Sequence, residues 1–157
     1  MLTQEPIGLL VAVVRRRIKQ AVSTLVREHD LSPQQFWTLM AVAMHEGASL
    51  RELADLQRMD PPTACRVVTA LTRRRLVHSG ADPSDRRRSR LVLTPSGRLL
   101  ADRLAPVAAA VRSAVEAGLT PSERAAVVAG LQKVIANLEG SRAGNGKRGD
   151  PGRNGNR

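Results

Sequence analysis

The chain has 157 residues and carries 25 Lys and Arg against 14 Asp and Glu, and this length suffices for one domain with a hydrophobic core. No apolar run reaches the roughly 20 residues that span a bilayer, because Arg15, Arg16 and Arg17 interrupt the first one. Residues 1–14 lack the features of a secretory signal, and the single cysteine, Cys65, excludes an internal disulfide. These features predict a cytoplasmic protein with no membrane contact.

The positive charge is concentrated in two segments. Residues 66–103 hold ten arginines against three acids, and residues 140–157 hold five basic residues against one acid. The rest of the chain is balanced, with ten basic and ten acidic residues. Because a clustered field of one sign repels itself, this pattern favours docking on a polyanion over an ordinary solvated surface.

Six helices are predicted from apolar spacing and from residues that start helices. Apolar side chains recur every three to four positions in the first, fifth and sixth helices. The start signals are three capping boxes and two Asp-Pro or Thr-Pro pairs: Ser32 to Gln35, Ser49 to Glu52, Thr120 to Glu123, Asp60-Pro61 and Thr94-Pro95. The expected helices cover residues 6–28, 33–47, 50–57, 61–75, 95–118 and 121–140.

A hairpin is predicted between the fourth and fifth helices. Residues 76–81 and 90–93 are short, partly β-branched runs, and a turn-rich segment that begins with Asp82 and Pro83 joins them. Two short helices followed by such a hairpin are typical of a winged helix-turn-helix. The expected fold is therefore mainly α, with six helices and a two-stranded β-wing.

The fourth helix is predicted to read DNA. Its apolar side consists of Ala64, Val67, Val68 and Leu71. Its opposite stripe consists of Pro62, Arg66, Thr69 and Arg73. We expect this stripe to face the major groove, with Arg66 on a guanine edge and with Thr63 and Thr69 on bases or phosphates. Arg73 and Arg74 are expected on the DNA backbone.

The chain resembles the MarR family of winged-helix regulators over residues 5–139. The most specific matches are Asp82-Pro83-Ser84-Asp85-Arg86-Arg87 and Leu91-Val92-Leu93-Thr94-Pro95-Ser96-Gly97, which follow the family patterns Asp-Pro-x-Asp-x-Arg and Leu-Thr-x-x-Gly. The resemblance implies a homodimer on a pseudo-palindromic operator of double-stranded DNA, usually a repressor. In many members a small phenolic or lipophilic effector, or an oxidant, releases the DNA.

The resemblance also bears on the wing and on the end of the fourth helix. The match implies that Arg87 enters the minor groove or is braced by Asp85, while Arg86 and Arg88 contact phosphates. The alternative is that Asp85 and Arg87 only hold the hairpin turn together. Arg75 stands where the family commonly has glycine, so the fourth helix is expected to end without a residue suited to the left-handed conformation.

The terminal helices are predicted to pair between two subunits. Their apolar stripes are too wide for a compact winged helix of about 65 residues to cover, and burial across a two-fold axis would place two recognition helices about 34 Å apart. A monomer with a three-helix cap is the alternative. The expected regions are residues 1–30 (first dimerisation helix), 31–97 (DNA-binding region), 98–139 (further dimerisation helices) and 140–157 (disordered basic tail).

Evidence for a sensor or a catalyst is sparse in the sequence. Trp37, Met40 and Met44 could line an effector pocket, although the core of the second helix is the favoured interpretation. Cys65 has no resolving partner, and the histidines form no cluster with metal-ligand spacing. No catalytic motif is present, so we expect neither an enzyme nor a metal or cofactor.

Two functions remain on this sequence. The first is a sequence-specific transcriptional regulator, with base contacts from the fourth helix. The second is an architectural or non-specific nucleic-acid-binding protein, in which the basic tail dominates.

Overall fold

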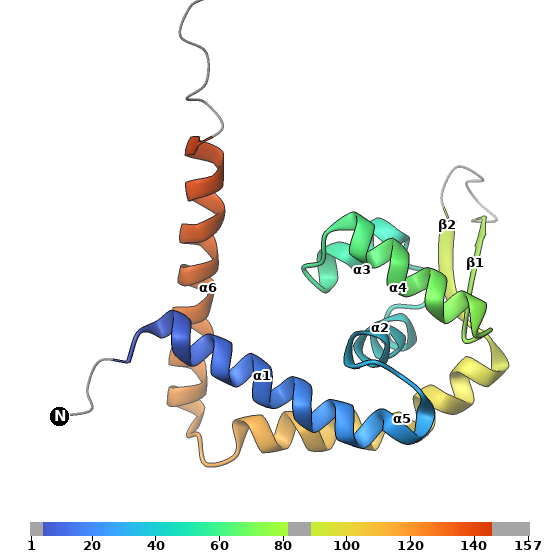
Figure 1. The fold of residues 1–157 in the computed structure, drawn as a ribbon, viewed down its shortest axis with the longest axis horizontal. Coiled ribbons are helices and arrows are strands. Elements are labelled where there is room, and N and C mark those ends of the chain that lie inside the picture. Colours follow the sequence, from blue (N-terminus) through green and yellow to red (C-terminus); the bar gives the residue numbers. More distant parts are fainter. Residues whose placement is uncertain (1–4, 82–88, 146–157) are drawn as a thin grey trace, which may run out of the picture. The chain divides into compact units, whose positions relative to one another are not determined.

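The computed structural model describes residues 5–81 and 89–145, with side chains described as far as Gly140. The chain divides into two compact units, Met1–Val115 and Glu116–Arg157. In chain order the elements are α1 (Ile7–Val26), the short 3-10 helix η1 (Arg27–His29), α2 (Pro33–Met44), α3 (Leu50–Leu56), α4 (Pro61–Arg73), β1 (Val77–Ala81), β2 (Ser89–Leu93), α5 (Pro95–Glu116) and α6 (Pro121–Asn145) (Figure 1). This confirms the predicted mainly α winged helix-turn-helix.

The helix starts are where the capping residues predict them. The backbone N–H of Gln35 donates to Ser32 Oγ over 3.1 Å, and the Ser32 N–H donates to Gln35 Oε1 over 2.9 Å. The same reciprocal pair joins Ser49 and Glu52 at 3.2 and 2.8 Å, and another joins Thr120 and Glu123. These bonds satisfy amide groups that have no partner within the first helical turn.

Two predicted helix ends are wrong. The second helix, α2, stops at Met44 rather than near Gly47, and Gly47 takes a φ of 89° in the turn that follows. The sixth helix does not stop at Gly140 but continues to Asn145. A single glycine inside a helix costs about 1 kcal/mol relative to alanine without interrupting the hydrogen-bond ladder, so glycine alone is a weak stop signal. The remainder of the predicted tail, residues 146–157, lies outside the described part of the chain.

The wing is an antiparallel pair with the register Val77↔Leu93, His78↔Val92, Ser79↔Leu91, Gly80↔Arg90 and Ala81↔Ser89. Its inner face buries Val77, Leu91 and Leu93. The second edge of β2 is also paired, because the Gly47 N–H donates to the Leu91 carbonyl over 2.8 Å and the Leu91 N–H donates to the Ala48 carbonyl over 2.9 Å. The wing stem is therefore fixed to the α2–α3 connection as well as to itself.

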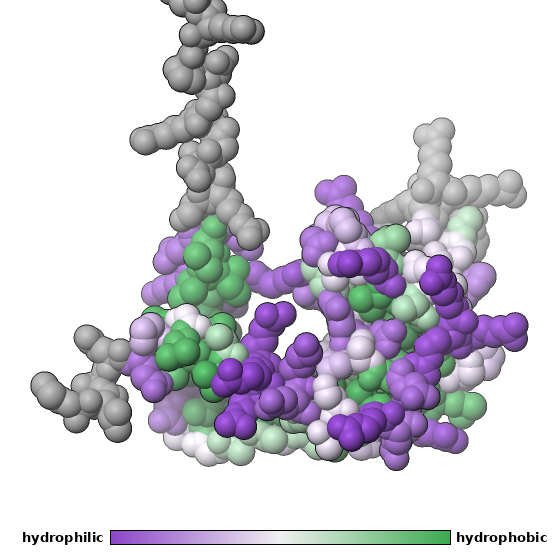
Figure 2. Space-filling view, viewed as in Figure 1, coloured by the Kyte–Doolittle hydropathy of each residue, from purple (hydrophilic) through white to green (hydrophobic). Residues whose placement is uncertain are grey.

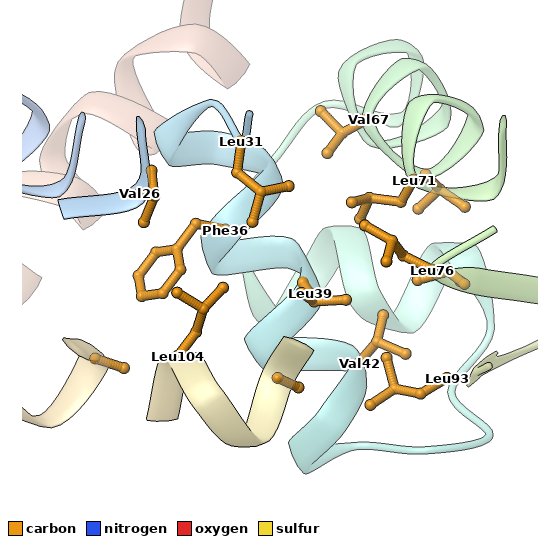
Figure 3. Packing of buried hydrophobic residues seen from close by; sticks show 14 of the residues in the cluster. Val26, Leu31, Phe36, Leu39, Val42, Val67, Leu71, Leu76, Leu93 and Leu104 are labelled. Atoms are coloured by element: carbon orange, nitrogen blue, oxygen red, sulfur yellow. The ribbon is translucent and has the colours of Figure 1, made fainter. Parts of the chain in front are cut away.

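The core of the first unit is formed by the end of α1, by α2, α3 and α4, by the wing stem and by α5 (Figure 3). Phe36 and Leu104 point toward each other in this view, and both are fully buried. Thr38 is also fully buried, and its Oγ1 donates to Gln57 Oε1 over 2.8 Å. This bond satisfies a polar group in the core and ties the middle of α2 to the end of α3.

Large apolar side chains remain exposed on the terminal helices of the single chain (Figure 2). On α1 they are Ile7, Leu9, Leu10, Val11, Val14 and Leu25. On α6 they are Val127, Val128, Leu131 and Leu138. Within the described residues, none of the helices is long and apolar enough to cross a membrane.

Candidate nucleic-acid interface

The fourth helix, α4, divides into a buried and an exposed side as its sequence predicts. Ala64, Val67, Val68 and Leu71 are buried in the core. Pro62, Arg66, Thr69 and Arg73 are exposed, while Thr63 is half-buried. A shallow, open depression on this helix is lined by Pro62, Cys65, Arg66, Thr69, Ala70 and Arg73. The structure thus brings the predicted groove-facing residues of α4 onto one accessible surface and adds Cys65 to it.

A short chain of hydrogen bonds organises the first turn of α4. Asp60 Oδ1 accepts the Thr63 backbone N–H over 2.9 Å, and Arg66 Nη2 donates to Thr63 Oγ1 over 3.0 Å. The bond from the Thr63 N–H holds the pKa of the Asp60 carboxyl below its ordinary value, so Asp60 stays ionised at neutral pH. Arg66 is thereby directed along the outer face of the helix, and its guanidinium has further N–H groups for another acceptor.

Three consecutive arginines at the end of α4 have three different environments. Arg73 is exposed on the same side as Arg66. The guanidinium of Arg74 is engaged within the chain, because its Nη1 donates to the Asp30 carbonyl over 2.6 Å and its Nη2 to the His29 carbonyl over 2.9 Å. Arg75 itself takes the left-handed conformation, with φ 56°.

The fourth helix, α4, is closed without glycine, as the sequence predicts, and Arg75 itself adopts the left-handed conformation. The Arg75 N–H donates to the Thr72 carbonyl over 2.9 Å, and the Leu76 N–H donates to the Leu71 carbonyl over 3.0 Å. This pair of bonds is the Schellman closure, which ordinarily places glycine at the position of Arg75. A non-glycine residue there costs about 1 kcal/mol or more, so neighbouring contacts must stabilise the turn.

Those contacts come from the start of α5. Thr94 Oγ1 and Ser96 Oγ donate to the Arg75 carbonyl over 2.6 and 2.9 Å, and the Gly97 N–H donates to Thr94 Oγ1 over 3.0 Å. A Cβ on Gly97 would overlap the carbonyl group of Leu76. The Thr94-to-Gly97 segment therefore fixes the turn that joins α4 to the wing.

A further support for the wing stem was missed by the sequence reasoning. Glu46 Oε1 accepts the Leu93 backbone N–H over 3.3 Å and forms an ion pair with Arg98. The bond from Arg98, more than any other contact, lowers the pKa of the Glu46 carboxyl from its ordinary value. Glu46 thereby links the end of α2 to β2 and to α5. No local sequence pattern predicts this role of Glu46, because Leu93 and Arg98 are far from it in sequence.

The predicted wing-tip residues Asp85, Arg86, Arg87 and Arg88 lie outside the described residues. Their roles in bracing the turn or contacting DNA remain predictions. The described stem ends at Ala81 and resumes at Ser89, which are paired with each other.

The three candidate effector residues lie on one side of α2 but differ in environment. Trp37 and Met40 are half-buried against the core, and the Trp37 ring meets the Phe36 ring edge-on with centroids 4.7 Å apart. Met44 is 66% exposed. The interpretation as core residues therefore holds for Trp37 and Met40 and is wrong for Met44, which lies at the end of the helix, beyond the buried part of the stripe.

Other chemistry receives no support from the described part of the chain. Within residues 5–81 and 89–145, no group of three or more His, Cys, Asp or Glu side chains could hold a metal ion. Cys65 is exposed and unpaired by disulfide.

Comparison with known proteins agrees with this geometry. A family model described as the MarR family matches residues 29–88. The HTH-type transcriptional repressor NicR of Pseudomonas putida is 32% identical over 124 residues, which cover 76% of this chain and 78% of that protein. The structure of Bordetella bronchiseptica BpsR, whose DNA binding is regulated by 6-hydroxynicotinic acid, is 29% identical with a TM-score of 0.72, over 86% of this chain and 96% of BpsR.

A third similarity concerns the fold. The Staphylococcus aureus MepR–DNA complex has a TM-score of 0.76 at 21% identity, over 85% of this chain and 99% of MepR. Proteins of the MarR family are transcriptional regulators and not enzymes. This chain belongs to the MarR family and is a transcriptional regulator that binds DNA.

Proposed function

We propose that the protein is a homodimeric repressor that binds a pseudo-palindromic operator and releases it when a small aromatic effector binds. The observation that carries this proposal is the outer face of α4, where Arg66 is oriented by Thr63 beside the exposed Thr69 and Arg73. An α-helix of this kind fits the major groove, and an arginine fork matches the acceptor pair of a guanine edge.

The individual contacts follow from the position of each side chain. Arg66 reads a guanine, and Thr63 and Thr69 contact bases or phosphates near it. Pro62, at the exposed start of the helix, packs against the DNA without donating a hydrogen bond. Arg73 lies toward the other end of the helix and contacts a phosphate, and of the wing-tip arginines Arg87 enters the minor groove while Arg86 and Arg88 contact phosphates.

A homodimer is supported by the apolar surface of the terminal helices. Ile7, Leu10 and Val14 on α1 are each at least 45% exposed in the single chain, as are Val127 and Leu138 on α6. Large exposed apolar side chains that recur along a helix often mark an interaction surface. Pairing two copies through these helices would bury them and would hold two copies of α4 in fixed register on a duplex.

Repression and effector control are supported by two relatives. NicR is a repressor, and the DNA binding of BpsR is regulated by 6-hydroxynicotinic acid. We propose the same chemical class for this protein, a small hydroxylated aromatic acid. The chain has one Trp, one Phe and no Tyr, so its effector site is lined mainly by aliphatic and Met side chains, with Trp37, Met40 and Met44 as the candidate walls.

The DNA-binding proposal is tested by selecting bound fragments from random duplexes. Wild-type protein should enrich an inverted repeat whose half-sites lie about one duplex turn apart. Arg66→Ala should weaken binding to the selected duplex by about 1–3 kcal/mol and relax the preference at one position of each half-site. Arg112→Ala is the matched control, because it removes the same charge from an exposed site on α5. An unchanged preference in Arg66→Ala would refute the assignment of Arg66.

Deletion of residues 141–157 separates this function from non-specific binding through the basic tail. For a sequence-specific regulator, the truncated chain keeps its preferred sequence and mainly shows a flatter salt dependence. If the tail dominates, truncation removes binding to selected and random duplexes alike.

The effector proposal has a separate test. Addition of 6-hydroxynicotinic acid should release the selected duplex. It should also raise the melting temperature, since a ligand of the folded state stabilises it by an amount that grows with the logarithm of the ligand concentration above Kd. Nicotinic acid, which lacks the hydroxyl group, is the matched control compound. Absence of both effects with a panel of hydroxylated aromatic acids would refute this effector class.

A further inference from the structure

The side chain of Arg74 contacts the backbone of Asp30 and His29, which precede it by 44 and 45 residues in sequence. Its two terminal nitrogens donate to the backbone carbonyls of Asp30 and His29, over 2.6 and 2.9 Å. Arg74 is the C-cap residue of α4, whereas His29 and Asp30 form the end of the turn that follows α1. The recognition helix is thus tied at its C-terminal end to the end of the first helix.

The geometry of the turn makes it a good acceptor for a guanidinium. Asp30 has a φ of 51°, and its N–H bonds back to the Arg27 carbonyl over 3.0 Å, which closes η1. The last carbonyls of a helical segment have no partner within it, and they form the negative end of its dipole. A planar guanidinium can donate to two of them at once, which a lysine ammonium on a flexible stem does less well.

The turn is also held firmly by apolar packing on both sides. Val26, just before η1, is fully buried, and Leu31, directly after Asp30, is 6% exposed. Figure 3 shows both side chains above Phe36, on the inner side of the core. The carbonyls that Arg74 contacts therefore belong to a fixed part of the first unit and can serve as an anchor.

We propose that Arg74 is a positioning residue, which sets the recognition helix relative to α1 rather than contacting DNA. The inference rests on the proposed function, in which α1 belongs to the dimer interface. A dimer that reads two half-sites needs a fixed separation and angle between its two copies of α4. The two hydrogen bonds from Arg74 to the turn after α1, here called the clamp, hold α4 in a fixed orientation relative to α1. It replaces the earlier expectation that Arg74 contacts the DNA backbone.

The test compares three variants on the duplex selected by wild-type protein and on a random duplex. Arg74→Ala removes both donors and the charge, and Arg74→Lys keeps the charge but not the fork. Arg73→Ala is the matched comparison, because it removes a neighbouring exposed arginine that is assigned to a phosphate. Affinities are measured over a range of salt concentrations, at a fixed interval below the melting temperature of each variant.

A positioning role and a phosphate contact give different results. We expect Arg74→Ala and Arg74→Lys both to lose about tenfold in affinity for the selected duplex, a change of 1.4 kcal/mol, with little loss on random DNA and an unchanged salt slope. Arg73→Ala should weaken both duplexes and lower the salt slope by about 0.9. The proposal would be overturned if Arg74→Lys bound the selected duplex with wild-type affinity and Arg74→Ala lowered the salt slope by about 0.9.

A measurement without DNA separates this inference from the proposed function. Cys65 is the one cysteine of the chain, and it is exposed on α4, so a spin label there reports the distance between the two recognition helices of a dimer. The distance distribution should broaden in Arg74→Ala and Arg74→Lys but not in Arg73→Ala. An unchanged distance distribution in Arg74→Ala and Arg74→Lys would refute the positioning role of Arg74. If wild-type protein enriches no sequence, the proposed function fails, while the label still tests the clamp.

Discussion

Replacement of Gly97 by alanine is expected to destabilise the protein strongly, because its Cβ has no room. A Cβ built on Gly97 lies 2.8 Å from the carbonyl carbon of Leu76 and 3.2 Å from its Cα, and it is closer still to the carbonyl oxygen. Favourable carbon contacts begin at about 3.5 Å. The Leu76 carbonyl cannot turn away freely, since it accepts the Thr94 N–H over 3.1 Å.

The magnitude follows from these distances. Forcing an extra methyl group into a packed site costs about 1–3 kcal/mol, and loss of the Thr94 bond adds about 1 kcal/mol. We therefore expect Gly97→Ala to lower the free energy of unfolding by about 2–4 kcal/mol, out of a total of about 5–15 kcal/mol for a typical domain. The melting temperature should fall by about 5–15 °C.

The assay is urea unfolding followed by far-UV circular dichroism and by the fluorescence of Trp37, the single tryptophan. Protein concentration is held constant, because dissociation of a dimer makes the midpoint depend on it. Gly130→Ala on α6 is the control, since no described atom beyond its chain neighbours and the nearby helix backbone lies within 4 Å of its Cβ position, and a helical glycine replaced by alanine gains about 0.5–1 kcal/mol. A Gly97→Ala protein within about 0.5 kcal/mol of wild type would refute the steric argument.

Two further predictions concern the same junction. Arg75→Gly should raise the free energy of unfolding by about 0.5–1 kcal/mol in urea titrations, because glycine adopts the left-handed conformation without strain; a loss of stability would show that the Arg75 side chain makes a contact outweighing the strain. Because the pKa of Glu46 is lowered in the folded state, its bond with Arg98 should stabilise the protein fully above the ordinary value of 4.5 and progressively less as the pH falls through the lowered pKa. Urea midpoints of wild type and Glu46→Gln should accordingly differ at pH 7, and the difference should shrink as the pH falls below 4.5; it should be small throughout because both side chains of the ion pair are more than a third exposed. A difference that does not shrink on acidification would contradict this reasoning.

Local signals in the sequence predicted most of the fold. The capping boxes at Ser32, Ser49 and Thr120 depend on residues three positions apart, and all three form as expected. The amphipathic division of α4 is equally local, because the helical period alone separates the side of Leu71 from the side of Arg66. For the same reason, the residues on the outer face of the candidate interface could be predicted from the sequence.

Contacts between distant segments could not be predicted in this way. The roles of Ser96 and Gly97 depend on the carbonyls of Arg75 and Leu76, and nothing near either pair in sequence points to the other. Arg74 was expected on DNA because exposed arginines beside a recognition helix usually contact phosphates. Its two acceptors are backbone carbonyls more than forty residues away, which carry no side-chain signature.

The pairing of β2 on both edges makes the wing stem less dependent on the residues that connect its two strands. A hairpin with two strands is marginally stable in isolation, but here the Gly47–Ala48 segment supplies a second line of hydrogen bonds, on the other edge of β2 at Leu91. The stem is thereby stabilised by hydrogen bonds that do not involve the connection between its strands. The sequence of residues 82–88 can therefore be varied in length and charge by design, with the paired stem and the helical scaffold left unchanged.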